Sequence, residues 1–287
     1  MSEDFIVILF YKFTAISNPK VFAKKHKEKC HELGLLGRMI VAEEGINATF
    51  EGKRGNIESY KDFLKSDPLF KDIVIKESLG NGHAFPKLSI KVRDEVVTLG
   101  AGRFDIPKET ATELSALELE NWYKNSEDFL VLDLRNDYEI ATGKFDRTVD
   151  PKLSNFRDLK DKLTEISHLK DKKVVAVCTG GIRCEKATCL LKREGFSNIY
   201  QLKDGIHSYI KEYPGKHFNG TLFVFDNRMT NDIVPTKNKT VIGQCHFCGH
   251  HTEKYYSDDS VRPSRKVLCC QTCYMRESVN LRDCTNK

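Results

Sequence analysis

Short apolar runs alternate with longer charged runs through the first hundred residues. The charged run after Asn18-Pro19 places apolar residues on one helical face and ends at Gly34, so it predicts a helix; residues 56–66 predict a second one. Strands are predicted at 5–11, 38–42, 47–51, 73–77 and 88–93, with a tight turn at 44–47. The order strand, helix, strand, strand, helix, strand is that of a ferredoxin-like (acylphosphatase-like) domain.

A different pattern begins after the Gly- and Pro-containing stretch 99–110, which is interpreted as a linker. A helix is predicted over 112–124, begun by Thr112 or Ser115. Apolar strands at 129–135, 173–178 and 198–202 then alternate with a helix at 185–196. Such alternation is typical of a parallel sheet covered by helices on both faces, because each parallel connection must cross the sheet.

The chain after residue 215 loses this periodicity, apart from a short predicted strand at 221–225, and is rich in Cys, His, Lys and Arg. The sequence therefore predicts a mixed α+β and α/β protein in three parts. They are a ferredoxin-like domain at 1–98 with a linker at 99–111, an α/β domain at 112–215, and a cysteine-rich region at 216–287.

Composition excludes several classes of protein. A hydrophobic content of 40% in 287 residues is too high for a disordered or collagen-like chain. No apolar run is long enough for a transmembrane helix, and the acidic start lacks the pattern of a secretory signal. A cytoplasmic protein that does not associate with membranes is expected. Its ten cysteines then need another explanation than disulfides, because cytosolic thiols stay reduced.

The most informative segment follows the strand at 173–178 and consists of Cys178, Thr179, Gly180, Gly181, Ile182 and Arg183. Its two glycines let successive N–H groups point at one centre, and the start of a helix adds positive potential. Arg183 closes the ring with a permanent cation. Each effect favours a thiolate, so Cys178 is predicted to have a lowered pKa and to act as a nucleophile.

These residues also have structural interpretations. Cys178 is then a small buried hydrophobe. Cys184 either resolves an oxidised or persulfidated Cys178 or is simply buried in the first helical turn. Cys189 is interpreted as a packing residue of the helix. Asp133 and Arg135 are predicted to form a structural ion pair rather than to bind substrate.

The segment CTGGIRCEKA at 178–187 resembles the signature of the rhodanese-like tRNA uridine hydroxylases, and residues 131–145 and 201–209 resemble other rhodanese segments. The stretches 43–52, 91–100 and 220–229 are similar to the same family. The resemblance implies a central rhodanese domain and 5-hydroxylation of the wobble uridine of tRNA. It implies molecular oxygen as co-substrate and Cys178 as the active-site cysteine. Neither the electron donor nor the oligomeric state follows from it.

The length of the cysteine loop bears on the alternatives. Four residues separate Cys178 from Arg183, whereas phosphatases of rhodanese-like fold have a loop one residue longer, which admits a tetrahedral phosphate. A sulfurtransferase that carries a persulfide on Cys178 is the main alternative, although the neutral Thr179 and Ile182 argue against thiosulfate as the donor. A zinc-dependent tRNA-binding module with an inactive loop is the third. The sequence shows neither a dinucleotide-binding fingerprint nor a clear iron set of two histidines and a carboxylate.

A second group of cysteines predicts a metal site. Two Cys-x2-Cys pairs, separated by 21 residues, have the spacing of a structural zinc site: Cys245, Cys248, Cys270 and Cys273. Other ligands are available in Cys269, Cys284, His246, His250 and His251. The alternative is a reduced, partly disordered tail, since the spacing departs from the denser cysteine pattern of the family that the chain resembles.

Charge is compatible with a nucleic acid partner. The net charge of +5 is modest, but distributed lysines and arginines suffice to contact the phosphates of tRNA. The candidate cations are Lys24, Lys25, Lys27 and Lys29 in the first helix and Arg262, Arg265 and Lys266 near the C-terminus. Tyr255 and Tyr256 are candidates for stacking on exposed bases.

Overall fold

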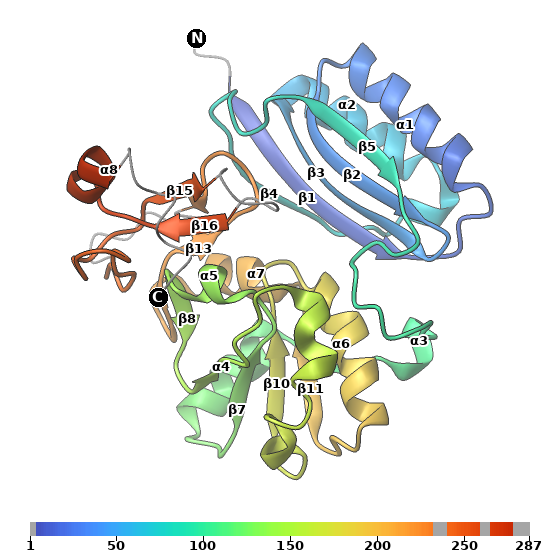
Figure 1. Ribbon diagram of the computed structural model, residues 1–287. Helices are drawn as coiled ribbons and strands as arrows, with labels where there is room; N and C mark the ends of the chain where they lie inside the picture. Colours follow the sequence, from blue (N-terminus) through green and yellow to red (C-terminus); the bar gives the residue numbers. More distant parts are fainter. Residues whose placement is uncertain (1–3, 232–239, 259–264, 278–287) are drawn as a thin grey trace. The chain divides into compact units, whose positions relative to one another are not determined.

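Two five-stranded sheets form the framework of the chain, and each belongs to a separate unit of the fold. The computed structural model describes residues 4–231, 240–258 and 265–277 (Figure 1). Its internal contacts divide the chain into the units Met1–Glu109 and Thr110–Lys287. In the described parts of the chain, no helix is long and apolar enough to cross a membrane.

The first unit contains a mainly antiparallel sheet with the strand order β4-β1-β3-β2-β5. The strands β1 to β4 have the order of a ferredoxin-like domain, which confirms the predicted fold, and β5 adds a fifth strand parallel to β2. Its elements are β1 (Phe5–Phe13), α1 (Pro19–Glu32), β2 (Leu36–Ala42), β3 (Gly45–Lys53), α2 (Arg54–Lys65), η1 (Pro68–Phe70), β4 (Ile75–Leu79) and β5 (Leu88–Val92).

The turn before β3 lies earlier than the sequence predicted. Glu43 and Glu44 form it, and β3 already begins at Gly45 instead of at residue 47. Gly45 has a φ of +146°, and a Cβ there would lie 2.1 Å from the carbonyl oxygen of Lys12. The glycine therefore permits β1 and β3 to approach closely at this end of the hairpin.

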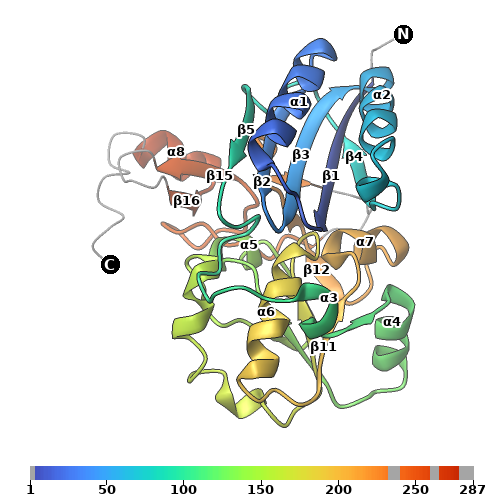
Figure 2. The same ribbon diagram turned by 90° about the vertical axis from the view of Figure 1, so that its right-hand side faces the viewer.

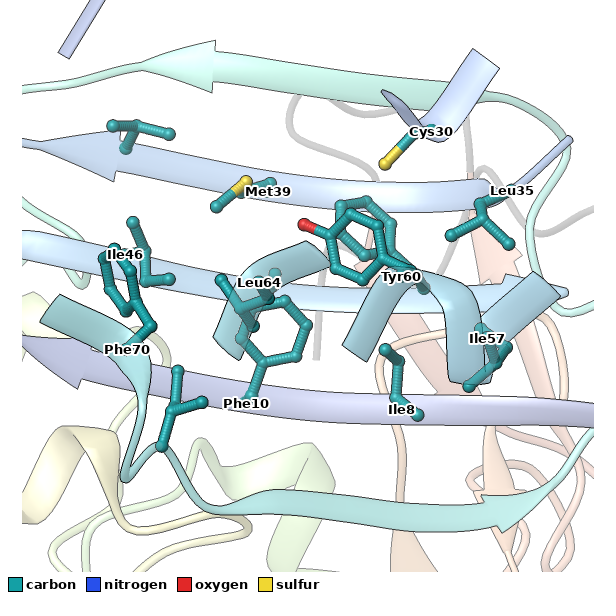
Figure 3. Packing of buried hydrophobic residues seen from close by; sticks show 14 of the residues in the cluster. Ile8, Phe10, Cys30, Leu35, Met39, Ile46, Ile57, Tyr60, Leu64 and Phe70 are labelled. Atoms are coloured by element: carbon teal, nitrogen blue, oxygen red, sulfur yellow. The ribbon is translucent and has the colours of Figure 1, made fainter. Parts of the chain in front are cut away.

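The core of the first unit lies between its sheet and the helices α1 and α2, which cover one face (Figures 1 and 2). Figure 3 shows Cys30 of α1, Tyr60 of α2 and Phe10 of β1 in this core, with the ring of Tyr60 between the other two. A polar contact is enclosed there, since Nδ1 of His26 lies 2.8 Å from the hydroxyl of Tyr60 and both residues are buried. The hydrogen bond offsets part of the cost of burying these two polar groups.

The opposite face of this sheet is covered by the segment that precedes β5. Ala84 and Phe85 are buried against Val7. The buried carboxylate of Glu51 accepts the N–H groups of Asn81 at 3.0 Å and Ala84 at 2.8 Å. A strand residue thus fixes the backbone of this segment.

The second unit contains a parallel sheet with the order β6-β11-β10-β7-β9. Helices α4 and α7 pack against the sheet face that carries Val131 and Val175, and α6 packs against β10 and β11. The predicted α/β domain is therefore confirmed. Its elements are β6 (Thr112–Leu114), α4 (Ala116–Lys124), β7 (Leu130–Asp133), α5 (Asp137–Ile140), β9 (Thr148–Val149), η2 (Phe156–Asp161), η3 (Ser167–Leu169), β10 (Val174–Val177), α6 (Ile182–Arg193), β11 (Ile199–Leu202) and α7 (Gly205–Glu212).

One local prediction in this region was wrong in part. Residues 112–114 form the edge strand β6 instead of the start of a helix, because they pair with β11. Of the two predicted helix starts, Ser115 is confirmed, since the helix begins after it and its side chain forms a capping box with Glu118. The stretch interpreted as a linker contains a short helix, α3 (Ile106–Glu109).

The C-terminal part of the second unit consists of two-stranded sheets around α5. Its elements are β8 (Gly143–Phe145), β12 (Phe218–Gly220), β13 (Leu222–Phe223), β14 (Thr230–Asn231), β15 (Tyr255–Asp258), β16 (Arg265–Leu268) and α8 (Gln271–Glu277). The hydroxyl of Tyr255 donates to the backbone carbonyl of Tyr138, and it lies 3.3 Å from the hydroxyl of Thr142. Tyr255 is buried and is therefore not available to stack on a base, contrary to the sequence prediction.

Candidate active site

Cys178 lies where β10 ends, and α6 begins four residues later at Ile182. Gly181 is the N-cap residue and has a φ of +101°, a conformation that residues with a side chain rarely adopt. Cys178, Thr179, Gly180 and Gly181 are buried, and Ile182 is half-buried. The predicted nucleophile thus lies at the carboxyl end of a central parallel strand, where α/β proteins bind ligands.

The start of α7 packs directly on this loop. The N–H of Ile206 donates to the carbonyl of Cys178, and the N–H of His207 donates to that of Thr179, both at 3.0 Å. Gly205 has a φ of +71°, and a Cβ at this position would lie 2.7 Å from the carbonyl oxygen of Cys178. Two helices therefore hold the loop in place, one at its end and one across it.

The surroundings of Cys178 favour a thiolate. Its Sγ accepts the N–H of Gly181 at 3.2 Å. Complete burial by itself would raise the pKa of the thiol. The side-chain hydrogen bond from Cys184, the cation of Arg183 and the N–H groups of these two residues outweigh burial and lower the pKa to about 6. These contacts favour the thiolate form of Cys178 over the thiol.

The guanidinium of Arg183 forms an ion pair with the carboxylate of Glu139. Both terminal nitrogens of Arg183 donate to Glu139, with Nη1 to Oε2 at 2.6 Å and Nη2 to Oε1 at 2.8 Å. The hydroxyl of Thr179 joins this pair, since it lies 3.2 Å from Nη2 of Arg183 and donates to Glu139 at 3.3 Å. Glu139 has no exposed surface, and Arg183 is buried. A fork-to-fork pair of this kind fixes the plane of the guanidinium.

Glu139 was not identified from the sequence as a residue of the site. It lies on α5, where its carboxylate also accepts the N–H of Asn136 at 3.0 Å and so caps the helix. It lies 44 positions before Arg183 in the chain. No sequence signal singled it out, because its burial and its pairing with Arg183 are visible only in the fold.

The predicted ion pair between Asp133 and Arg135 is confirmed. Nε of Arg135 donates to Oδ1 of Asp133 at 2.9 Å and Nη2 donates to Oδ2 at 2.6 Å, with neither residue exposed. Arg135 also donates to the backbone carbonyls of Glu139 at 3.2 Å and Gly143 at 2.6 Å. The pair therefore connects the end of β7 to α5 and β8 and has a structural role.

The two cysteines of α6, Cys184 and Cys189, differ in whether they contact Cys178. Cys184 is buried and hydrogen-bonds to Cys178, and burial raises its own pKa well above the usual value, so it remains a neutral donor. Cys189 is also buried, and its thiol contacts the carbonyl of Glu185 at 3.1 Å. Cys189 thus contacts its own helix, whereas Cys184 contacts the thiol of Cys178 directly.

Four thiols of the C-terminal region converge. The Sγ atoms of Cys245, Cys248, Cys270 and Cys273 all lie within 4.8 Å of one another. Sγ of Cys248 and Sγ of Cys270 are 3.7 Å apart. Tetrahedral coordination with metal–sulfur bonds of about 2.3 Å requires separations of about 3.8 Å between sulfurs, so the arrangement fits a metal ion. Cys269 and the nearby histidines are outside this group, and Cys284 lies outside the described residues.

The candidate RNA-binding side chains belong to both units of the chain. Lys24, Lys25 and Lys27 of α1 are exposed, whereas Lys29 is half-buried and pairs with Glu32 at 2.7 Å. The second predicted group is Arg262, Arg265 and Lys266. Arg262 and the side chain of Arg265 lie outside the described residues. Nζ of Lys266 donates to the hydroxyl of Ser257 at 2.5 Å. The ring of Tyr256 stacks on Tyr274 at 3.6 Å.

The strand, cysteine loop and helix of the second unit define a rhodanese-like protein, and three family models match consecutive parts of the chain. They are the UPF0176 acylphosphatase like domain at residues 5–96, the rhodanese-like domain at 115–212 and the rhodanase C-terminal model at 219–286. A rhodanese-related protein of known structure from Thermoplasma volcanium is 26% identical, with a TM-score of 0.29, and the match covers 36% of this chain and 93% of that one.

Relatives over nearly the whole chain are more specific. The tRNA uridine(34) hydroxylase of Cytophaga hutchinsonii is 37% identical over 271 residues, which cover 94% of this chain and 86% of the relative. That of Onion yellows phytoplasma is 40% identical over 274 residues, which cover 93% and 88%. The chain therefore belongs to the tRNA uridine(34) hydroxylase family, which confirms the resemblance noted from the cysteine loop.

Proposed function

We propose that this protein hydroxylates C5 of uridine 34 in tRNA and that Cys178 is the residue on which the reaction depends. The observation that carries the proposal is the lowered pKa of a cysteine held by three backbone N–H groups and a cation at the ligand-binding edge of a parallel sheet. The names of the full-length relatives favour hydroxylation over the alternative of sulfur transfer.

The overall reaction needs an oxidant and a two-electron donor. Uridine, molecular oxygen, two electrons and two protons give 5-hydroxyuridine and water. In the proposed role, the thiolate of Cys178 adds to C6 of the uracil ring, which forms a carbon–sulfur bond and moves the electron pair of the C5–C6 double bond onto C5. Once C5 has gained the oxygen atom, loss of its proton and cleavage of the carbon–sulfur bond restore the double bond and the thiolate.

Access to the sulfur sets a condition on this step. Cys178 has no solvent-exposed surface. Addition to a base therefore requires a local opening of the loop when the RNA binds. Ile182, which is half-buried, is the loop residue nearest to solvent between Cys178 and Arg183. Keeping the thiolate covered until then protects it from oxidation in solution.

The remaining parts of the chain receive supporting roles in the proposal. Residues 1–98 act as a platform for the RNA, with the exposed lysines of α1 as phosphate contacts. Cys245, Cys248, Cys270 and Cys273 hold one structural Zn²⁺, which the separation of their thiols permits. The protein acts in the cytoplasm, where tRNA is available.

The test is nucleoside analysis of tRNA from a strain that lacks the gene. Expression of the wild-type chain should restore 5-hydroxyuridine at position 34, and Cys178→Ser or Cys178→Ala should not. Cys189→Ala is the matched control, since it removes another buried thiol from the same region. Retained modification in the Cys178 variants would exclude the cysteine from the reaction. Cyanide-dependent turnover of thiosulfate, without any change in tRNA, would favour the sulfurtransferase.

A further inference from the structure

An exposed aromatic ring lies beside the buried cation of the cysteine loop. Phe225 is 42% exposed, and it is the one aromatic ring among the large apolar side chains that are exposed in the described residues. Its ring centre lies 5.7 Å from Cζ of Arg183. The same guanidinium is bonded to Thr179, the residue next to Cys178. The ring therefore contacts Arg183, and Arg183 contacts Thr179 beside Cys178.

Hydrogen bonds and a ring contact hold the segment that carries Phe225. Phe223 pairs with Thr230 in the hairpin of β13 and β14, and the N–H of Val224 donates to Met229 at 2.8 Å. In the connection, Asp226 accepts Nε of Arg228 at 2.8 Å. The ring of Phe225 also meets the ring of Phe223 edge to face, with centres 5.3 Å apart. An aromatic ring held in this way loses little further entropy when it contacts a ligand.

The chemistry of this position favours a flat, uncharged ligand. The guanidinium of Arg183 is occupied by the carboxylate of Glu139, so the pair is close to neutral and is a weak partner for a phosphate. Phe223 and Arg183 contact the ring of Phe225 on its buried side, and 42% of the residue remains exposed to solvent. Aromatic rings in such surroundings bind nucleic acid bases by stacking, without regard to charge.

We propose that Phe225 is a substrate-binding residue on which the uracil ring of the target nucleotide stacks beside the Cys178 loop. The inference rests on the proposed function and adds to it the contact that places the base. A pyrimidine on this ring would be unstacked from its neighbours and held near the loop that carries the thiolate. Extruding or splaying the target base in this way is how enzymes that modify bases reach their atoms.

The test measures binding, so that it does not depend on the unidentified electron donor. Anticodon stem-loops with uridine or with an abasic site at position 34 are titrated with the wild-type chain and with Phe225→Ala, Phe225→Leu, Phe225→Tyr and Phe225→Trp. We expect the wild type, Tyr and Trp variants to prefer the uridine RNA. The Ala and Leu variants should lose most of that preference, about tenfold or more in Kd.

Leu117→Ala is the matched control, because Leu117 is an apolar side chain of the same unit with 55% exposure and lies on α4, outside the site. It should keep the wild-type preference. Phe225→Ala and Phe225→Leu variants that still discriminate uridine from the abasic site would overturn the inference, as would a wild type without any preference. The proposed function fails separately, if the wild type does not restore 5-hydroxyuridine in the deletion strain.

Discussion

Glu139 and Arg183 form a bidentate ion pair, with nitrogen–oxygen distances of 2.6 and 2.8 Å, behind the loop of Cys178. The pair joins the short helix α5 to the start of α6. Both side chains are buried, so water does not compete for the ion pair. The cation that stabilises the thiolate is thus held by a residue from a different part of the sheet edge.

Glu139→Gln should destabilise the second unit and reduce activity. The substitution leaves the buried cation of Arg183 without its counter-charge, which costs about 3–5 kcal/mol in comparable buried pairs. Urea unfolding and nucleoside analysis measure the two effects. The double variant Glu139→Gln with Arg183→Met is expected to recover part of the stability but not the activity. A single variant with wild-type stability would show that the pair does not hold the loop.

Cys184→Ala should raise the pKa of Cys178 above about 6, because the hydrogen bond from Cys184 is the strongest of the contacts that lower it. Alkylation of the Cys178 peptide by iodoacetamide, followed by mass spectrometry from pH 5 to 9, gives this pKa. At pH 6 the rate should fall roughly fivefold for a rise of one unit. Cys189→Ala is the control and should leave the profile unchanged. An unchanged profile in Cys184→Ala would remove Cys184 from the site.

Gly205→Ala should displace the cysteine loop, since a Cβ would lie 2.6 Å from the nitrogen of Gly181 and 2.7 Å from the oxygen of Cys178. We expect a loss of about 2 kcal/mol or more in unfolding free energy. Gly195→Ala is the control for backbone strain alone. Gly195 also has a positive φ, +92°, but its nearest contact would be 3.9 Å away. Equal effects in both variants would mean that α7 does not constrain the loop.

The purified protein should contain one zinc per chain, measured by plasma mass spectrometry. Cys270→Ser should lose the metal and expose the amides of β15 and β16 to hydrogen exchange, because a small hairpin gains much of its folding free energy from the metal. Cys269→Ala should keep the metal, since Cys269 is adjacent in the chain but outside the converging group. Zinc retained at full occupancy in Cys270→Ser would contradict the proposed ligand set.

The first unit should lose stability as the pH falls from 6.5 to 4. Burial, with a smaller contribution from Lys25, lowers the pKa of His26 to about 4. In the unfolded chain the imidazole binds a proton below about pH 6.5, so the unfolded state binds more protons in this window and stability rises with pH across it. The difference amounts to about 3 kcal/mol at most.

Hydrogen exchange of the amides in β1 to β3, corrected for the intrinsic rate, measures this loss in the full chain. His26→Gln should be less stable at pH 7 but should show a much smaller change between pH 6.5 and 4. His31→Gln, on the exposed side of the same helix, should behave as the wild type does. A wild-type slope retained in His26→Gln would assign the titration to another group.

Helices and strands could be predicted from the sequence where the pattern of nearby residues determines them. In the first unit, apolar alternation and the start signal at Asn18-Pro19 identified the strands and α1, because each element has one face in the core. Thr112–Leu114 was misassigned because its extended conformation comes from pairing with β11, which follows nearly ninety residues later. Three residues carry too little local information to reveal such a partner.

In the candidate active site, likewise, only the residues that are contiguous in the chain could be predicted. The Cys178 loop is contiguous, so its glycines and Arg183 could be interpreted together from the sequence. Glu139, Gly205 and Phe225 come from three other segments, and their relation to the loop depends on how α5, α7 and the β13–β14 hairpin pack. In the same way, the sequence suggested that Tyr255 is an exposed ring in a basic tail, because its partners Tyr138 and Thr142 are visible only in the structure.

The attachment of Tyr255 to α5 has a consequence for protein synthesis. A ribosome that has just completed α7 has made the whole cysteine loop, but the tyrosine that fastens α5 is still to be translated. The thiol of Cys178 would then be present before Tyr255 holds α5, which carries the Glu139 that pairs with Arg183. A product of premature termination would remain in that state, so we expect such fragments to be cleared by proteolysis rather than to accumulate as partly active enzyme.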